Sequence, residues 1–160
     1  NAYIQMTRKA MESEGIRERE ETEILNDLDV HEAWANQICR KTEEMPVIDW
    51  TKSNYSRMNL KNRNLSGIDF TGSLMKNCDF TACNLTGVDF TGCNLTGAIF
   101  LNAILAQNTF DGAKLEDIKI DQKNLQLFEN AGIAVNTDQT GPMNISVNRS
   151  VLSRKGNTAV

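Results

Sequence analysis

The side chains best suited to catalysis or metal binding in this 160-residue chain are four cysteines and a single histidine. Thiols pair as disulfides or hold zinc, but zinc ligands come in short paired spacings that these cysteines lack. Three of them recur where a repeat places small side chains inside the protein, so we interpret them as buried free thiols. Free thiols predict a reducing compartment, such as the cytoplasm. The four are Cys39, Cys78, Cys83 and Cys93.

No constellation for hydrolytic chemistry is visible around the histidine. His31 has no cysteine or serine beside it in a triad-like context. Asp49, Asp69 and Asp89 recur at twenty-residue intervals, and carboxylates stacked this way repel unless they are hydrogen-bonded or bridged by a cation. Aspartate is nevertheless the ordinary residue at that place of the repeat, so it does not indicate a metal site. We therefore predict no catalytic residue, no metal, no cofactor and no enzyme.

The repeat that holds these residues has an apolar side chain at every fifth position from Trp50 to Leu125. Neither a helix (3.6) nor a strand (2.0) has this period, so the chain must turn a corner every five residues. Two positions before each apolar centre lies a small or aliphatic residue, as Cys83 lies before Leu85. Asp or Asn stands between the two, and Thr-Gly often follows, which suits the positive φ of a tight turn. Each quintet is predicted to form one short extended side and one corner.

Side chains also match at intervals of twenty, which predicts that four sides close one coil. Stacked coils bury ladders of similar residues between neighbours, as in other solenoids. The ladders expected in the core are Trp50, Phe70, Phe90 and Phe110; Leu65, Leu85 and Leu105; and Phe80 and Phe100.

This pattern resembles the pentapeptide-repeat family, because CDFTACNLTGVDFTGCNLTGAIF (residues 78–100) is close to its A-(D/N)-L-x-x consensus. The resemblance implies an all-β solenoid core, a right-handed quadrilateral β-helix of about four coils, and a bacterial source. It also implies a non-catalytic module for protein–protein interaction or scaffolding whose partner the sequence does not name.

Four segments are expected along the chain: an N-terminal helical segment and cap over residues 1–44, the β-helix over 45–120, a C-terminal capping helix over 121–133 and a mobile polar tail over 134–160. An open solenoid end exposes apolar side chains and unpaired edges that need a cover. We expect a helix break at residues 26–29 and a second helix over 30–42, with Trp34 and Ile38 on one face, as that cover. At the other end Leu125, Phe128 and Ala131 are expected to face the last coil, with Gly132 ending the helix.

Four apolar residues occupy outward positions that are polar elsewhere in the repeat: Leu74, Ile99, Leu101 and Ile104. An exposed apolar cluster is either a docking surface or the seat of another part of the same chain. The first helix, with Ile16, Ile24 and Leu25, is the expected cover, and the alternative is a protein partner or self-association. Arg63 and Lys123 fall in the inward column, where we expect long side chains to leave at the corners.

Charge and composition limit the kinds of function that we expect for this chain. A formal net charge of −4 argues against nucleic-acid binding, which needs clustered Lys and Arg. No apolar run is long enough to span a bilayer. Some members of the family mimic DNA and act on gyrase, but acidic and basic residues nearly balance between residues 50 and 125, so this is the weaker alternative. The chain begins without Met, which keeps open that it is the binding or targeting portion of a larger secreted bacterial effector, reaching a host cell without a signal peptide.

Overall fold

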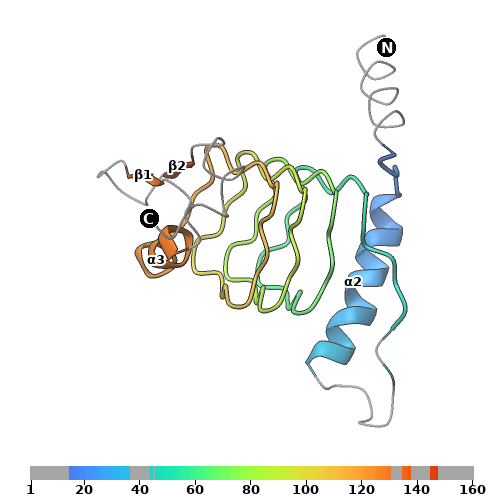
Figure 1. Ribbon diagram of the computed structural model, residues 1–160. Coiled ribbons are helices and arrows are strands. Elements are labelled where there is room, and N and C mark those ends of the chain that lie inside the picture. Colours follow the sequence, from blue (N-terminus) through green and yellow to red (C-terminus); the bar gives the residue numbers. More distant parts are fainter. Residues whose placement is uncertain (1–14, 37–43, 45, 131–134, 138–144, 148–160) are drawn as a thin grey trace.

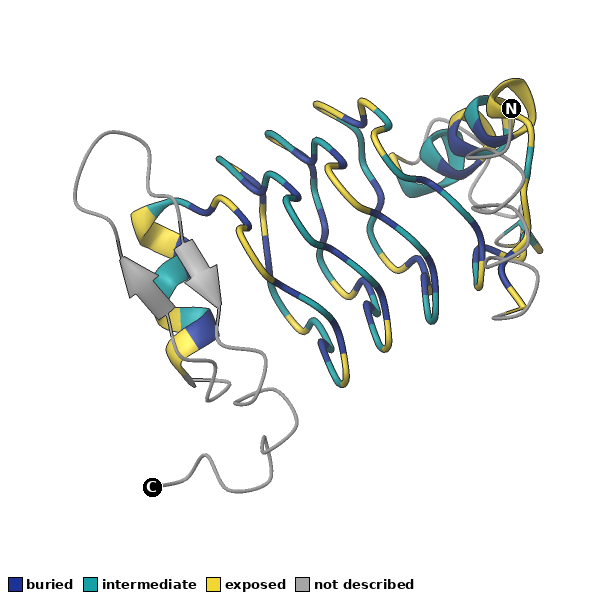
Figure 2. Cartoon of the chain, turned by 90° about the horizontal axis from the view of Figure 1, so that it is seen from above, coloured by how far each residue is buried: buried dark blue, intermediate teal, exposed yellow. Residues whose placement is uncertain are grey.

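The computed structural model describes residues 15–36, 44, 46–130, 135–137 and 145–147. Its elements in chain order are helix α2 (Glu21–Ala35), a stack of coils, helix α3 (Gln122–Asn130) and the strands β1 (Val135–Thr137) and β2 (Ile145–Val147). Helix α2 lies across one end of the stack and α3 at the other (Figure 1). From above, buried and exposed positions alternate around each coil (Figure 2).

Parallel bridges between residues twenty positions apart join adjacent coils. One column of bridges runs through Asn54, Leu74, Asn94 and Lys114, which marks four successive coils. The other three columns start at Asn59, Asn64 and Asp69. These four columns are the four sides that the twenty-residue period predicts.

The pairings within the described coils are isolated bridges and not extended strands. A strand needs several extended residues in succession, whereas the backbone here turns at every fifth residue. The corner residues have positive φ, as at Asn77 (58°), Ala82 (60°) and Gly92 (66°). Only one residue per side therefore forms a bridge, and the expected all-β core takes the form of stacked single bridges.

The centre column fills the inside of the coils. All nine predicted ladder residues are buried. Phe70 and Phe90 stack with ring centroids 6.1 Å apart, and Phe90 and Phe110 with centroids 5.3 Å apart. Phe80 and Phe100 form a second stack at 5.1 Å. Since every coil presents the same kind of side chain to its neighbour, each ring packs on the ring one coil away.

Helix α2 covers the first coil as one continuous helix, so the expected break at residues 26–29 is wrong. Ile24, Leu28 and His31 are spaced as one helical stripe, and all three are buried. Asp29 does not cap a new helix, because it lies inside α2; its carboxylate lies 3.3 Å from the Arg63 guanidinium. The buried stripe therefore replaces the expected pair of Trp34 and Ile38; Trp34 is half-buried, and residues 37–42 of the expected helix lie outside the described residues.

The segment before α2 adds one more bridge to the first coil. Arg17 pairs with Ser53 in parallel. The Arg17 N–H donates to Lys52 O (2.6 Å), and the Asn54 N–H donates to Arg17 O (3.1 Å). Backbone groups at this edge of the solenoid are thus satisfied by the chain itself, as an exposed edge requires.

Helix α3 closes the other end. Phe128 is fully buried, and its ring centroid lies 5.2 Å from that of Phe110. Leu125 packs against the core as expected, although it is half-buried. Asn124 beside it is buried, and its amide donates to Ala103 O (3.0 Å). Ala131 and Gly132 lie outside the described residues.

Part of the expected polar tail has regular structure. β1 and β2 pair antiparallel, with Val135 opposite Val147 and Thr137 opposite Ile145. These two short strands lie within the polar tail that the sequence predicts to be mobile, and its mobility stays a prediction. The other residues of 134–160 lie outside the described part of the chain.

Candidate interaction surface

Three of the four outward apolar residues lie around one corner of the third coil. Ile99 bridges Asp79 and Lys119, and Ile104 bridges Asn84 in the next column. Leu101 lies in the turn between them. We call Ile99, Leu101 and Ile104 the apolar corner. Leu74 belongs to another column of bridges, one coil nearer α2, so the structure does not bring it into this group.

The apolar corner is open to solvent on one side of the turn, at Ile104. Ile104 is 53% exposed, while Ile99 and Leu101 are half-buried. Among the described residues only Val30, Val47 and Ile104 are exposed large hydrophobic side chains. An exposed isoleucine beside two partly covered apolar side chains is a local feature that binding to another apolar surface would stabilise.

Helix α2 does not cover the apolar corner, so the expected intramolecular cover is wrong for this helix. Ile16 and Ile24 are 8% and 2% exposed, and Ile24 belongs to the same core cluster as Trp50. Leu25 also packs against that cluster. The open end of the solenoid needs this apolar stripe, and α2 lies across that end (Figure 1).

Charged side chains of both signs flank the apolar corner. Asp79 lies 3.4 Å from Lys61, and Asp121 accepts a hydrogen bond from the Asn102 N–H (2.7 Å). Burial opposes ionisation of Asp79, but hydrogen bonds from Thr81 together with Lys61 outweigh it and lower the pKa of this carboxyl. Lys123 leaves no coil corner, because it lies on α3, within the range expected for the capping helix, 3.9 Å from Asp121. An apolar centre with a polar rim is the usual composition of an interface patch.

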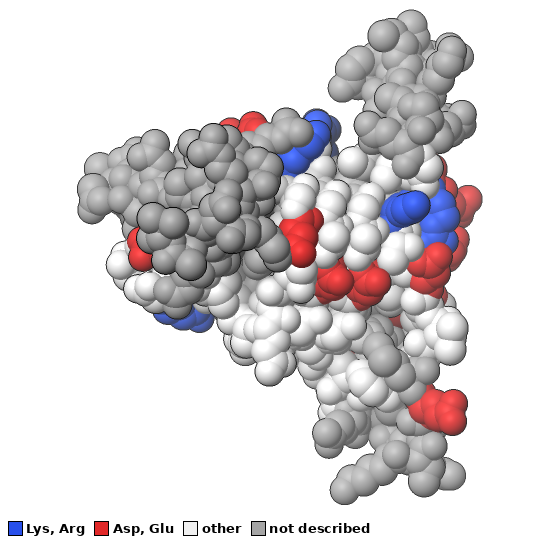
Figure 3. Space-filling view, in the orientation of Figure 1, with Lys and Arg blue, Asp and Glu red and all other residues white. Residues whose placement is uncertain are grey.

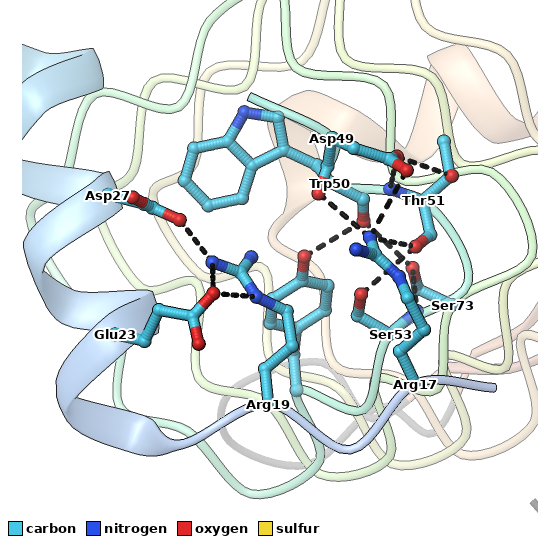
Figure 4. Close-up of polar contacts among 10 residues, drawn as sticks. Arg17, Arg19, Glu23, Asp27, Asp49, Trp50, Thr51, Ser53 and Ser73 are labelled. Atoms are coloured by element: carbon cyan, nitrogen blue, oxygen red, sulfur yellow. Dashed lines mark hydrogen bonds and ion pairs between the residues drawn. The ribbon is translucent and has the colours of Figure 1, made fainter. Parts of the chain in front are cut away.

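A second cluster, which we did not predict from the sequence, anchors the start of α2 (Figure 4). The Arg19 side chain is only 7% exposed; it pairs with Glu23 (2.9 Å) and Asp27, and its guanidinium lies 6.0 Å from the centroid of the Trp50 ring. Burial acts to lower the pKa of Arg19, but the hydrogen bonds to these carboxylates raise it above its usual value. The sequence feature that could have indicated this ion pair was the four-residue spacing of Arg19 and Glu23.

Arg17 extends this anchor to the coil. Its guanidinium donates to Asp49 O and Thr51 O, both at 2.8 Å. The Asp49 carboxylate accepts from the Thr51 hydroxyl (2.6 Å) and N–H (3.0 Å), and these bonds lower the pKa of Asp49. Asp69 and Asp89 accept from their threonines two residues on in the same way. The aspartates of this column therefore stabilise the turns of the coils through these hydrogen bonds.

His31, considered as a catalytic residue from the sequence, lies in the interface between α2 and the first coil. It is 1% exposed, and its Nε2 lies 3.0 Å from Ser66 O. Burial is the main cause that lowers the pKa of His31, against the opposing effects of Ser66 O and Glu32. Next to it, Arg63 leaves the inward column as expected and pairs with Glu32 (2.9 Å).

The three described cysteines are free and buried. Their thiols donate to backbone carbonyls: Cys78 to Tyr55 O and Cys83 to Leu60 O at 2.8 Å, and Cys93 to Phe70 O at 3.0 Å. Burial raises the pKa of Cys78 and Cys93 to about 12 and that of Cys83 to about 11. A nucleophile must be a thiolate, so these thiols are packing groups. Cys39 lies outside the described residues.

Three observations complete the description of the surface. Within the described ranges, no cluster of three or more His, Cys, Asp or Glu side chains is arranged to hold a metal ion. In the same part of the chain, no helix combines the length and apolarity needed to cross a membrane. The face in Figure 3 carries both acidic and basic groups, in places side by side, among uncharged surface, and so lacks the uniform negative charge of a duplex.

A protein-family model, that of pentapeptide repeats (8 copies), matches residues 56–92 and 83–122. No curated protein matches the chain.

Solved structures similar to the chain include three pentapeptide repeat proteins. The pentapeptide repeat protein Rfr23 from the cyanobacterium Cyanothece 51142 is 22% identical with a TM-score of 0.29, and the match covers 51% of this chain and 66% of that one. A pentapeptide repeat protein from the Arabidopsis thaliana thylakoid lumen is 16% identical with a TM-score of 0.31, covering 65% and 86%. One from Nostoc Pcc 7120 is 24% identical with a TM-score of 0.22, covering 43% and 69%. The chain thus spans just under two thirds of the Cyanothece protein.

Proposed function

The chain belongs to the pentapeptide-repeat family through residues 56–122, and from this premise we propose that it is a non-catalytic protein–protein interaction or scaffolding module. Proteins of this family are generally structural or interaction modules without catalysis. We also propose that the coils form a right-handed quadrilateral β-helix. Four columns of bridges support the four sides, and the family supports the hand.

The observation that carries the proposal is the apolar corner, which the hydrogen-bonded third coil holds in place. Backbone hydrogen bonds tie the third coil to its neighbours on both sides, as in Ile99 N–H to Cys78 O (2.9 Å) and Phe100 N–H to Lys119 O (2.7 Å). Ile99, Leu101 and Ile104 are therefore held in a fixed arrangement before any partner arrives. A preformed surface binds without a large ordering cost.

The shape of the apolar corner favours a different protein over a second copy. Ile99 and Ile104 lie in neighbouring columns on the two sides of a turn, so together they form a ridge. Two ridges meeting across a two-fold axis bury little area, whereas a stable interface needs about 1,200 Å² or more. A ridge fits an apolar groove, and we propose that the apolar corner binds a different protein that has such a groove.

The test compares the wild-type chain with Ile99→Lys/Ile104→Lys and with Leu74→Lys, a matched control in another column. Light scattering should give a monomer for all three. Cross-linking should then trap one partner with the wild type and with Leu74→Lys, and the partner should be lost with the double variant, because two lysines desolvate poorly in an apolar groove.

Two outcomes would contradict this assignment. A wild-type dimer that the double variant dissociates would make the corner a self-association surface. A partner held equally by all three proteins would place binding on another surface of the molecule.

The cytoplasm is part of the same proposal. Cys78, Cys83 and Cys93 are unpaired, and free thiols are most common in reducing compartments, which supports this location.

A further inference from the structure

The only histidine of the chain and both of its tryptophans meet under α2. The His31 ring centroid lies 6.1 Å from that of Trp34 on the same helix and 6.1 Å from that of Trp50 on the first coil, the latter edge to face. Its Nε2 lies 3.0 Å from Ser66 O, in the turn that ends the fourth side of the coil. One side chain thus joins α2 to two separate sides of the first coil.

This environment suits a neutral imidazole. In the neutral ring, Nε2–H donates to Ser66 O and Nδ1 carries no proton. Protonation would place a positive charge with 1% exposure between two indole rings and would add a second N–H that needs an acceptor.

The charged groups around His31 offer little compensation for such a charge. Glu32 on α2 is already paired with Arg63 of the first coil, and Asp29 shares that guanidinium. Arg19, from the segment before α2, lies over the Trp50 ring and is paired with Glu23 and Asp27. Arg19 and Arg63 therefore already hold the carboxylates that would stabilise an imidazolium.

We propose that His31 makes α2 a proton-sensitive latch, in which the neutral imidazole holds the helix on the first coil and protonation in mildly acidic solution releases it. Release would uncover Trp50 and Tyr55, which are 5% and 2% exposed in the closed form. The coils beyond the first keep their own bridges and ladders, so the solenoid stays folded while its end opens.

The sign of the effect follows from linkage. Burial lowers the pKa of His31 in the closed form, whereas an exposed histidine titrates near 6.5. The closed form is fully favoured above about pH 6.5 and loses stability as the pH falls, by about tenfold in the opening equilibrium per pH unit until the closed-form pKa is reached.

Two measurements on the full chain test the latch. NMR of the sole imidazole should give a pKa below about 6.5 in the folded protein. Hydrogen exchange, corrected for the intrinsic rate, should show α2 amides opening up to about twenty-five-fold more at pH 5.0 than at pH 7.0, with unchanged protection in the coils. A pKa at or above the ordinary value, or a low pKa without faster exchange in α2, would overturn the latch.

His31→Gln is the matched variant, because its amide can donate to Ser66 O from the place of Nε2 and does not titrate. Its α2 amides should exchange independently of pH between 5.0 and 7.0. If the variant keeps the wild-type pH dependence, another group is responsible and the assignment to His31 fails. Should the variant not fold, the two wild-type measurements still decide the question.

Discussion

The residue that precedes each buried centre performs two tasks in the coils. Asp69 bridges Asp89 through its backbone, while its carboxylate accepts from the Thr71 N–H at 2.9 Å. Asp and Asn favour such local turns because their short side chains reach the backbone two residues on. One residue type therefore fixes both the side and the following corner, which explains its frequency in the repeat.

At the same scale, Phe90 should be among the most sensitive positions. Its ring is fully buried and packs on Phe70, Phe80, Phe100 and Phe110. Phe90→Ala should lower the free energy of unfolding by about 3–5 kcal/mol, because it removes buried area and leaves a cavity. Denaturant titration measures this loss. Lys76→Ala, at an exposed position, should change it by less than about 0.5 kcal/mol; equal effects would argue against a continuous aromatic core.

At the scale of elements, α2 is held mainly by one stripe. Ile24, Leu28 and His31 lie in the interface, and ion pairs at Arg19 and Arg63 fix both ends of the helix. Ion pairs with partly exposed partners contribute little on their own. The apolar stripe should therefore dominate the docking energy, and the charges should set the position of the helix.

The helix offers a matched pair of substitutions for testing this. Leu28 is 1% exposed and Val30, on the same helix, is 44% exposed. Leu28→Ala should cost about 2–5 kcal/mol of docking free energy, whereas Val30→Ala should cost less than about 0.5 kcal/mol. Hydrogen exchange of α2 amides measures both. Similar losses of protection in the two variants would show that the helix is not anchored through the Leu28 face.

For the whole molecule, the length of one coil is the property that matters most. Every bridge in the four columns joins residues twenty positions apart. Stability in such a stack is close to a sum over neighbouring coils, so the protein should tolerate loss of one complete coil better than loss of a fragment of one.

Deleting residues 73–92 joins Gly72 to Cys93 and preserves the five-residue pattern. This shortened chain should still unfold cooperatively, at a lower temperature than wild type. Deleting only Val88 and Asp89 shifts inward and outward positions within one side and should abolish cooperative unfolding, because polar groups enter the core. Circular dichroism during heating distinguishes the two. Failure of both deletions would mean that coils are not interchangeable units.

The fold of the coils was predictable because its signals are local. Five neighbouring residues specify one side and one corner. The inward direction of Leu85 therefore follows from its place in its own quintet, without information from distant parts of the chain. The same locality placed Cys83 and Cys93 inside and predicted the outward position of Ile104.

The two ends were less predictable, because they depend on contacts between distant segments. Sequence favoured a helix break at residues 26–29, but Ile24 and Leu28 keep α2 continuous by packing on the first coil. The place of His31 between Trp34 and Trp50, and the pairing of Arg63 with Glu32, likewise join residues that no period relates. A repeat pattern states which side chains turn inward; it carries no information on which helix face covers an open end, since that depends on shape and charge brought together only when the chain folds.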